Sequence, residues 1–429
     1  MSGPGAVAVL SKKSLAERPY DRWLCPGPVH LYAQDDAPTR ALLAAGRLTG
    51  YASVRLFDRW KTNQAVELAV VRDSVRHPVG RVVSLSECDV LRSARLRAHL
   101  GLPGQSVASA TTFRDKVEMK AAAAAGGLSV PRFRRVSTVW DVLDFAAALR
   151  SPVVVKPVAG SGSVGVRVLR CPGDVTAWVD TVCGTADEPL GLIAEEYVDA
   201  TLATVEGVLA GGEVRFAFPA AYPEPCLTAL DGRAPQSVLM LDPDDATARR
   251  LVAYVRRLVR ALPTPAEPTS FHAELFVHPT RGVMLCEIAC RTGGDRIPDI
   301  AGAAFGVDLE CASARGQAGL PVELPDRPVR PDRLFGDLLV PPTGGTLVAA
   351  PTRCPLPGVV SYRLHTRPGT WHPPVGKVSE RIADVLFAAD GPEQLRALQR
   401  RLVAWCAAEF RWAGDRSSGA PPGASAASV

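Results

Sequence analysis

Three closely spaced glycines mark the first segment of the sequence that could do chemistry. Gly160, Gly162 and Gly165 have the G-x-G-x-x-G spacing of several phosphate-binding loops. The β-branched run before them, residues 152–157, predicts a buried strand, and the alternating apolar and basic residues 166–170 predict a second strand. A dinucleotide-binding turn needs a helix after the glycines, a P-loop needs Gly-Lys-Ser/Thr, and a protein kinase needs His-Arg-Asp and Asp-Phe-Gly. The sequence meets none of these conditions, so the pattern predicts a glycine hairpin of another kind.

The predicted hairpin carries groups that suit phosphate. Glycine lets backbone N–H groups come close to phosphate oxygens, and Ser161 and Ser163 add hydroxyl donors. Lys156, on the strand that leads into the loop, can place a positive charge on the same group. A flexible surface hairpin with a solvated lysine is the alternative interpretation.

A second group of polar residues lies on two predicted strands, residues 271–277 and 283–288. His272 and Glu274 alternate along the first strand and therefore share a face, while Glu287 lies on the strand that pairs with it. Two carboxylates that converge across adjacent strands suit Mg²⁺ with phosphates. The alternative is a surface hairpin with solvated acids, but the neighbouring residues are strongly apolar. His272 taken alone is better explained as a structural residue.

Arg291 follows the second acid by four residues, at the end of the predicted strand. A fixed guanidinium at that point could stabilise a phosphoryl group during transfer. Gly293 and Gly294 come next, and their N–H groups could bind an oxyanion.

An apolar strand, residues 192–198, ends in Glu-Glu-Tyr-Val. The edge of such a strand could hold a nucleotide base through backbone N–H and C=O groups and one carboxylate. Adjacent acids at a strand end are more often a solvated rim, so this segment taken by itself is a weak indication.

The order of these segments resembles that of a known superfamily. Arg-Asp-Lys at residues 114–116 is followed by the Lys-Pro strand with its glycine hairpin, by Glu-Glu-Tyr-Val, and by His-x-Glu with Glu-x-x-x-Arg-x-Gly-Gly. This series resembles the ATP-grasp superfamily, and more narrowly its carboxylate–amine ligases, which include L-amino acid ligases, over about residues 20–310. The resemblance implies that ATP and Mg²⁺, with Mn²⁺ as an alternative, are the cofactors.

The resemblance also implies roles for individual residues. Arg291 and Lys156 would be catalytic, with Arg291 facing the γ-phosphate and the acyl phosphate, and Glu274 and Glu287 would bind the metal. The glycine hairpin would fold over the triphosphate as a lid. The nucleotide would be bound by Lys116, Lys156, Gly160, Ser161, Gly162, Ser163, Gly165, Glu195, Glu196, Tyr197, Val198 and Glu206, the last of these near the ribose.

Two positions depart from the family pattern. Members commonly have an asparagine two residues after the second metal-binding glutamate, as a further ligand, where this chain has Ala289. Many members have a ribose-binding glutamate where this chain has Leu202. The first departure puts the geometry of a second metal ion in doubt.

The bulk composition is that of an ordinary globular protein. The chain has 429 residues, of which 47% are hydrophobic and 22% charged, and no apolar run approaches the length of a membrane span. The N-terminus does not have the order of a secretory signal, and the ten cysteines form no C-x-x-C pair, so we expect a cytoplasmic protein with reduced thiols. The net charge of +5 is not clustered, so we expect neither a nucleic-acid nor a membrane partner. A homodimer is one expected state.

We predict an α/β fold with an α+β central part, arranged as four segments. Alternating strands and helices in residues 1–105 predict a small preceding domain with a parallel sheet. Residues 106–310 would form an ATP-grasp core of two lobes, with the lid hairpin at about 152–170. Residues 311–413 would form a C-terminal mixed α/β region, and 414–429 a disordered tail. Helices are expected from residue 113 through the alanine run to 125, at 244–262 and at 392–410.

The predicted reaction joins a small carboxylate and an amine as an amide or peptide bond through an acyl phosphate, releasing ADP and phosphate. A specialised pathway such as natural-product assembly is the expected setting. Two alternatives stay open: an ATP-dependent carboxylase of the biotin-carboxylase type, and a catalytically impaired nucleotide-binding regulatory protein, which Ala289 favours.

Overall fold

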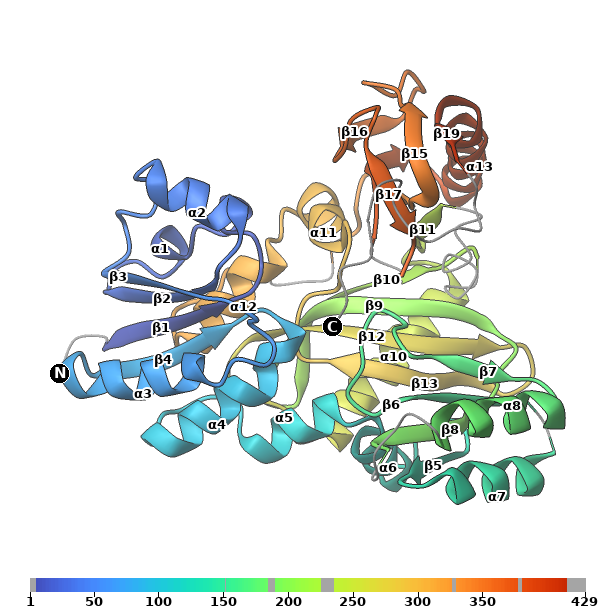
Figure 1. Cartoon of the computed structure of the whole chain (residues 1–429), viewed down its shortest axis with the longest axis horizontal. Helices are drawn as coiled ribbons and strands as arrows, with labels where there is room; N and C mark the ends of the chain where they lie inside the picture. The colour runs from blue at the N-terminus through green and yellow to red at the C-terminus, as the bar shows by residue number, and fades with distance from the viewer. Residues whose placement is uncertain are drawn as a thin grey trace, which may run out of the picture.

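The computed structural model describes residues 5–150, 152–183, 190–224, 235–325, 329–376 and 380–414. Strands in these ranges form four sheets that are covered by helices, which confirms the α/β class (Figure 1). Almost all of the predicted tail, 414–429, lies outside the described residues. Within the described ranges, no helix has the length and apolarity needed to cross a bilayer.

The N-terminal sheet is parallel, as predicted, with the order β3-β2-β1-β4. Its strands are β1 (Ala6–Ser11), β2 (Val29–Gln34), β3 (Ser53–Phe57) and β4 (Val79–Ser84). The sequence reasoning missed β1, an interior strand whose six residues are all buried. The helices of this unit are α1 (Tyr20–Trp23), α2 (Ala37–Ala44), α3 (Ala65–Arg76) and α4 (Val90–Leu100).

A four-stranded antiparallel sheet carries the glycine hairpin. Its order is β5-β8-β6-β7, made of β5 (Phe133–Val136), β8 (Leu192–Glu196), β6 (Val153–Pro157) and β7 (Arg167–Leu169). The strands β6 and β7 pair antiparallel, which confirms that the glycines join two strands. The helices α7 (Val139–Leu149) and α8 (Pro172–Cys183) pack on this sheet through Val142, Leu149 and Val175.

The largest sheet has eight strands in the order β13-β12-β9-β10-β11-β14-β18-β16. Its first half consists of β9 (Thr201–Ala210), β10 (Glu213–Ala221), β11 (Gln236–Met240), β12 (Thr269–His278) and β13 (Gly282–Ala289). One face is covered by α10 (Ala246–Ala261) and α6 (Lys116–Ala125), whose apolar side chains share a core with Leu275 and Leu285.

The helix predicted across residues 113–125 is two helices. The first, α5 (Val107–Arg114), ends before Asp115, and α6 begins immediately after it. The Asp115 carboxylate accepts hydrogen bonds from the Val117 and Glu118 N–H groups and so caps α6. Arg114 is therefore the last residue of one helix and Lys116 the first residue of the next.

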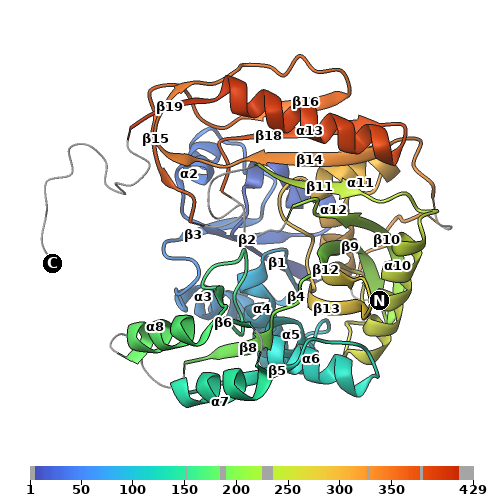
Figure 2. The same cartoon turned by 90° about the vertical axis from the view of Figure 1, so that its right-hand side faces the viewer.

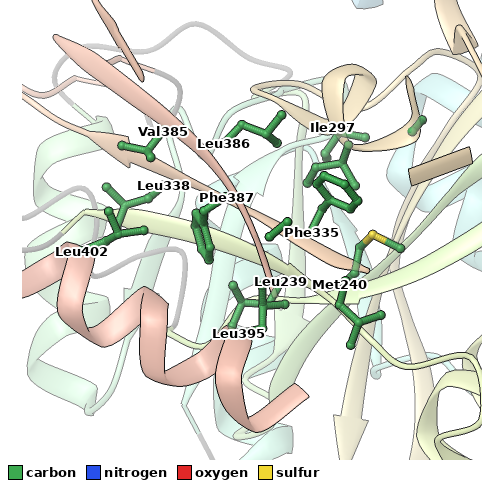
Figure 3. Packing of buried hydrophobic residues seen from close by; sticks show 14 of the residues in the cluster. Leu239, Met240, Ile297, Phe335, Leu338, Val385, Leu386, Phe387, Leu395 and Leu402 are labelled. Carbon is green, nitrogen blue, oxygen red and sulfur yellow. The ribbon is translucent and has the colours of Figure 1, made fainter. Parts of the chain in front are cut away.

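The strands after residue 310 extend the large sheet. These are β14 (Leu334–Val340), β18 (Ala383–Ala389) and β16 (Val359–Leu364), while β15 (Thr343–Ala349), β17 (Trp371–Pro374) and β19 (Arg411–Ala413) form a separate small sheet. The long helix α13 (Pro392–Glu409) lies along β14 and β18 (Figure 2). Leu395 and Leu402 of this helix pack against Leu338 and Phe387 (Figure 3). The eight-stranded sheet continues past residue 310 through β14, β18 and β16. The domain boundary predicted at residue 310 stays a prediction.

Two helices connect these units. The helix α12 (Leu309–Gln317) lies against the N-terminal sheet, where the Gln317 amide bonds with the backbone of Ser84. The helix α11 (Ile297–Phe305) is joined to the C-terminal strands by Arg296, which is 1% exposed and pairs with Asp384 at 2.6 Å and with Asp299 at 2.8 Å. Replacing one partner of such a buried ion pair destabilises the fold, because the other charge is left buried and unpaired.

Asp384→Asn tests this connection. Burial raises the pKa of Asp384, but hydrogen bonds from His365 and the charge of Arg296 outweigh it and lower the pKa from 3.8 to about 2. The folded pKa is depressed, so the stabilisation is present above about pH 4 and is lost as the pH falls toward 2. We expect Asp384→Asn to lower the free energy of unfolding at pH 7 by about 2 kcal/mol.

Urea denaturation at pH 7, 5, 4 and 3 measures this difference, which should shrink below pH 4. Asp390→Asn is the matched control, because its ion pair with Arg333 is exposed and should contribute less than about 1 kcal/mol. A loss of unfolding free energy in Asp384→Asn that does not change with pH would contradict a stabilising role for the ionised Asp384 carboxylate.

Candidate active site

The predicted acidic residues lie on one face of three neighbouring strands, β9, β12 and β13. Glu274 is flanked by Thr204 on β9 and Glu287 on β13, and His272 in the next row is flanked by Glu206 and Ala289. Residues that are directly opposite on adjacent strands share a face of the sheet. The structure therefore brings Glu274 and Glu287 together, as the sequence predicted.

This alignment depends on a β-bulge that the sequence reasoning missed. Glu274 is opposite Glu287, but the next residue on β12, Leu275, is opposite Leu285, so Cys286 is an extra residue on β13. Leu275 and Leu285 lie in the apolar core on the other face of the sheet. The bulge changes the phase of β13, so that Glu287 falls on the same face as Glu274.

Glu287 forms an ion pair with Lys116 from the start of α6. The Lys116 Nζ atom is 2.9 Å from Glu287 Oε2 and also donates to the Gly160 carbonyl at 3.0 Å. Burial would raise the pKa of Glu287, but the charges of Lys116 and Lys156 outweigh it and hold the pKa well below its usual range. One lysine thus links β13 to the glycine hairpin.

Lys156 and Glu195 form a second buried ion pair. Lys156 Nζ lies 3.1 Å from Glu195 Oε2, and Lys120 Nζ lies 3.5 Å from the other oxygen. Burial lowers the pKa of Lys156, but the Glu195 carboxylate outweighs it and raises the pKa above its ordinary value. Lys120 was missed from the sequence, although it lies one helical turn after Lys116 on the same face of α6.

Glu196 is held by two arginines. Arg132 donates to one carboxylate oxygen at 2.9 Å, and Arg281, from the turn between β12 and β13, donates to the other. The Arg170 guanidinium lies over the Tyr197 ring at 5.4 Å. Val198 is buried. The predicted contact between the segment 195–198 and an adenine stays a prediction.

Three residues of the loop between β6 and β7 have a left-handed backbone conformation. Gly162 and Gly165 have φ values of 64° and 76°, and Ser163 between them has 59°. A Cβ atom at Gly165 would lie 3.1 Å from the Pro157 ring, so the close contact and the positive φ both favour glycine there. Gly160 provides the carbonyl that Lys116 binds, and Ser161 is exposed.

Arg291 is bound by an acid from the N-terminal unit. Its Nε atom donates to Glu87 Oε2 at 2.6 Å, and Arg114 donates to the other oxygen of Glu87. Arg114 also donates to the Ala159 carbonyl in the glycine hairpin. Glu87 follows β4, and the rule that ligands bind at the carboxyl edge of parallel strands could have identified it.

His272 is paired with Glu206. The Nδ1 atom is 2.5 Å from Glu206 Oε1, and Nε2 is 3.6 Å from Glu274. Burial lowers the pKa of His272, but Glu206 outweighs it and raises the pKa to about 10, so the ring is an imidazolium. A Cβ atom at position 293 would lie 2.7 Å from Glu206 Oε2, so a larger residue there would displace the Glu206 carboxylate. The predicted ribose contact of Glu206 stays a prediction.

The donor set fits a divalent ion that is shared with phosphates. Glu274 and Glu287 provide two carboxylates in register, and in the described part of the chain no group of three His, Cys, Asp or Glu side chains is arranged to hold an ion. Mg²⁺ in nucleotide sites takes one or two protein carboxylates and completes its shell with phosphate and water. Two buried lysines and a glycine loop beside these acids fit a polyphosphate.

Lys116→Met tests the link between α6 and the hairpin. The variant removes the hydrogen bond to the Gly160 carbonyl, so we expect faster amide exchange in residues 158–166, measured by hydrogen–deuterium exchange mass spectrometry. Lys61→Met is the control, because Lys61 is exposed on another unit and should leave the hairpin unchanged. Equal exchange in wild type and Lys116→Met would contradict the link.

The comparisons with known proteins agree with this geometry. The chain is 26% identical over 335 residues to an uncharacterised protein of Sinorhizobium fredii, which is 76% of this chain and 67% of that protein. It is 22% identical over 297 residues to an L-arginine-specific L-amino acid ligase of Bacillus subtilis, which is 66% and 71% of the two chains. No protein-family model matches.

Among solved structures, an L-amino acid ligase from Bacillus licheniformis superposes with a TM-score of 0.72 and 18% identity, over 96% of this chain and 100% of that chain. This likeness confirms the predicted fold. The chain has the ATP-grasp fold, and L-amino acid ligases are among the proteins that it is similar to in sequence and in structure.

Proposed function

We propose that the chain is an ADP-forming ligase that joins a carboxylate to an amine through an acyl phosphate. The observation that carries this proposal is the pairing of Glu274 and Glu287 on one face of the sheet. Lys116 contacts Glu287, and Arg291 follows the end of the strand that carries Glu287. This is a set of charges suited to positioning a triphosphate and neutralising a phosphoryl group during transfer.

The chemistry follows from the poor reactivity of a carboxylate. An oxygen of the acid attacks the γ-phosphorus of ATP, the bond to ADP breaks, and the acid becomes an acyl phosphate. The amine then attacks the acyl carbon and loses a proton, and phosphate leaves with one oxygen of the original acid. A bound Mg²⁺, held by Glu274 and Glu287, would neutralise charge on the phosphates.

The chain's own residues have separate tasks in this scheme. Lys116 and Lys156 bind phosphate oxygens. In the structure, Lys116 is paired with Glu287 and Lys156 with Glu195. Arg291, oriented by Glu87, faces the transferred group. The hairpin at 160–165 covers the phosphates and excludes water, which would otherwise hydrolyse the acyl phosphate.

Amino acids are the substrates to test first, because they are named for the Bacillus subtilis relative. Phosphate release from ATP is measured with pooled amino acids and small acids, and the product is identified by mass spectrometry. ADP together with an amide or peptide supports the proposal. ADP release that depends on bicarbonate alone would indicate a carboxylase, and nucleotide binding without turnover across the panel would indicate a regulatory protein.

Two substitutions test the assigned roles. Lys156→Met removes the charge on the hairpin strand and Glu287→Gln removes one metal-binding charge, so we expect each to reduce product formation by at least about 100-fold. Circular dichroism and thermal melting check that both variants fold. Rates like those of the wild type in either folded variant would refute the role of that residue.

A further inference from the structure

One face of helix α6 lies directly on the bulged strand β13. Its buried residues are Lys116, Met119, Lys120 and Ala123, which have the spacing of a single helix face. Lys116 has a role in the site through Glu287. Lys120 is 0% exposed and has no task in the proposed reaction.

The contacts of this face concentrate on the bulge. Lys120 Nζ donates to the carbonyl of Cys286 at 2.6 Å and to that of Leu285 at 3.0 Å. Met119 Sδ accepts the N–H of Ile288 at 3.2 Å. The helix therefore binds backbone groups on both sides of Glu287, while Lys116 binds the Glu287 side chain at 2.9 Å.

A bulge leaves backbone groups without their usual ladder partners. A buried carbonyl that has no donor costs about 1–3 kcal/mol, so a bulge in a buried strand needs a donor from elsewhere. The ammonium group of Lys120 has three donors, and its three neighbours are the two carbonyls and Glu195 at 3.5 Å. This side chain thus joins the bulge to the acid that holds Lys156.

We propose that Lys120 is a positioning residue, which stabilises the bulge at Cys286 and thereby keeps Glu287 on the face of Glu274. The proposal rests on the proposed function in one respect, namely that Glu287 binds the metal. Lys120 is fully buried under the sheet and acts through the backbone of β13, not on a substrate.

Lys120→Met tests this role with a readout that does not depend on turnover. Glu195 keeps its partner Lys156 at 3.1 Å, so the substitution leaves no unpaired buried carboxylate. Electron paramagnetic resonance measures Mn²⁺ binding in the presence of ADP, and hydrogen exchange of residues 282–289 measures the bulge. We expect Mn²⁺ affinity to fall by about 10- to 100-fold, with faster exchange in this segment.

Arg97→Met is the matched control. Arg97 is also a buried cation that donates to a strand carbonyl, that of Val82 at 2.6 Å, but it lies in the N-terminal unit. We expect it to lower the melting temperature without changing Mn²⁺ affinity or exchange in β13. Wild-type Mn²⁺ affinity in folded Lys120→Met would overturn the proposal.

Two further results separate the possible failures. If Lys120→Met does not fold, Lys120→Gln is measured in the same way. Its side chain is one bond shorter than that of lysine and no longer places a donor at both carbonyls, so wild-type affinity in that variant overturns the proposal. Glu287→Gln serves as the reference for the metal site itself. If it leaves Mn²⁺ affinity unchanged, the proposed function fails; if it abolishes binding while both Lys120 variants bind normally, only the role of Lys120 fails.

Discussion

Buried ammonium groups must be paired, and this constraint organises the site. Lys116, Lys120 and Lys156 are each less than 9% exposed, between the hairpin sheet and the large sheet. An unpaired buried charge costs several kcal/mol, so each lysine has to lie against a carboxylate or a set of carbonyls. The partners, Glu287 and Glu195, come from the two different sheets. Lys120 bridges the two sheets, because it binds carbonyls of β13 in the large sheet and lies 3.5 Å from Glu195 in the hairpin sheet.

The same constraint explains how three parts of the chain meet at one point. Arg291 of the core, whose side chain is 15% exposed, is paired with Glu87 of the N-terminal unit, which also binds Arg114. Arg114 and Lys116 both donate to carbonyls in the glycine hairpin. A movement of the hairpin would therefore shift these two side chains and change their ion pairs with Glu87 and Glu287. Under the proposed function this coupling would bring the hairpin and the charged residues into place together around the phosphates.

Local patterns in the sequence predicted the parts of the site that depend on nearby residues. The glycine hairpin, the acids of β12 and β13 and the parallel N-terminal sheet were predicted correctly, because period-two alternation and turn residues are local signals. The break at Asp115 was missed because the alanine run after it has a high helix propensity on its own. The strand β1 was missed because its short, continuous apolar run has no period-two alternation, although Gly-Pro-Gly stands immediately before it.

The remaining features depend on contacts between distant segments. Nothing local to Cys286 indicates a bulge, since its donor, Lys120, is 166 residues away. Glu87 and Arg291 are 204 residues apart, and the C-terminal strands join the large sheet through β11. Such pairings become visible only when the fold is known.

Anomalous diffraction from crystals grown with Mn²⁺ and ADP tests most directly whether these charges surround a nucleotide. We expect a manganese peak between the carboxylates of Glu274 and Glu287, with the hairpin at 160–165 over the phosphates. A peak elsewhere, with both carboxylates directed to bulk solvent, would contradict the proposed site.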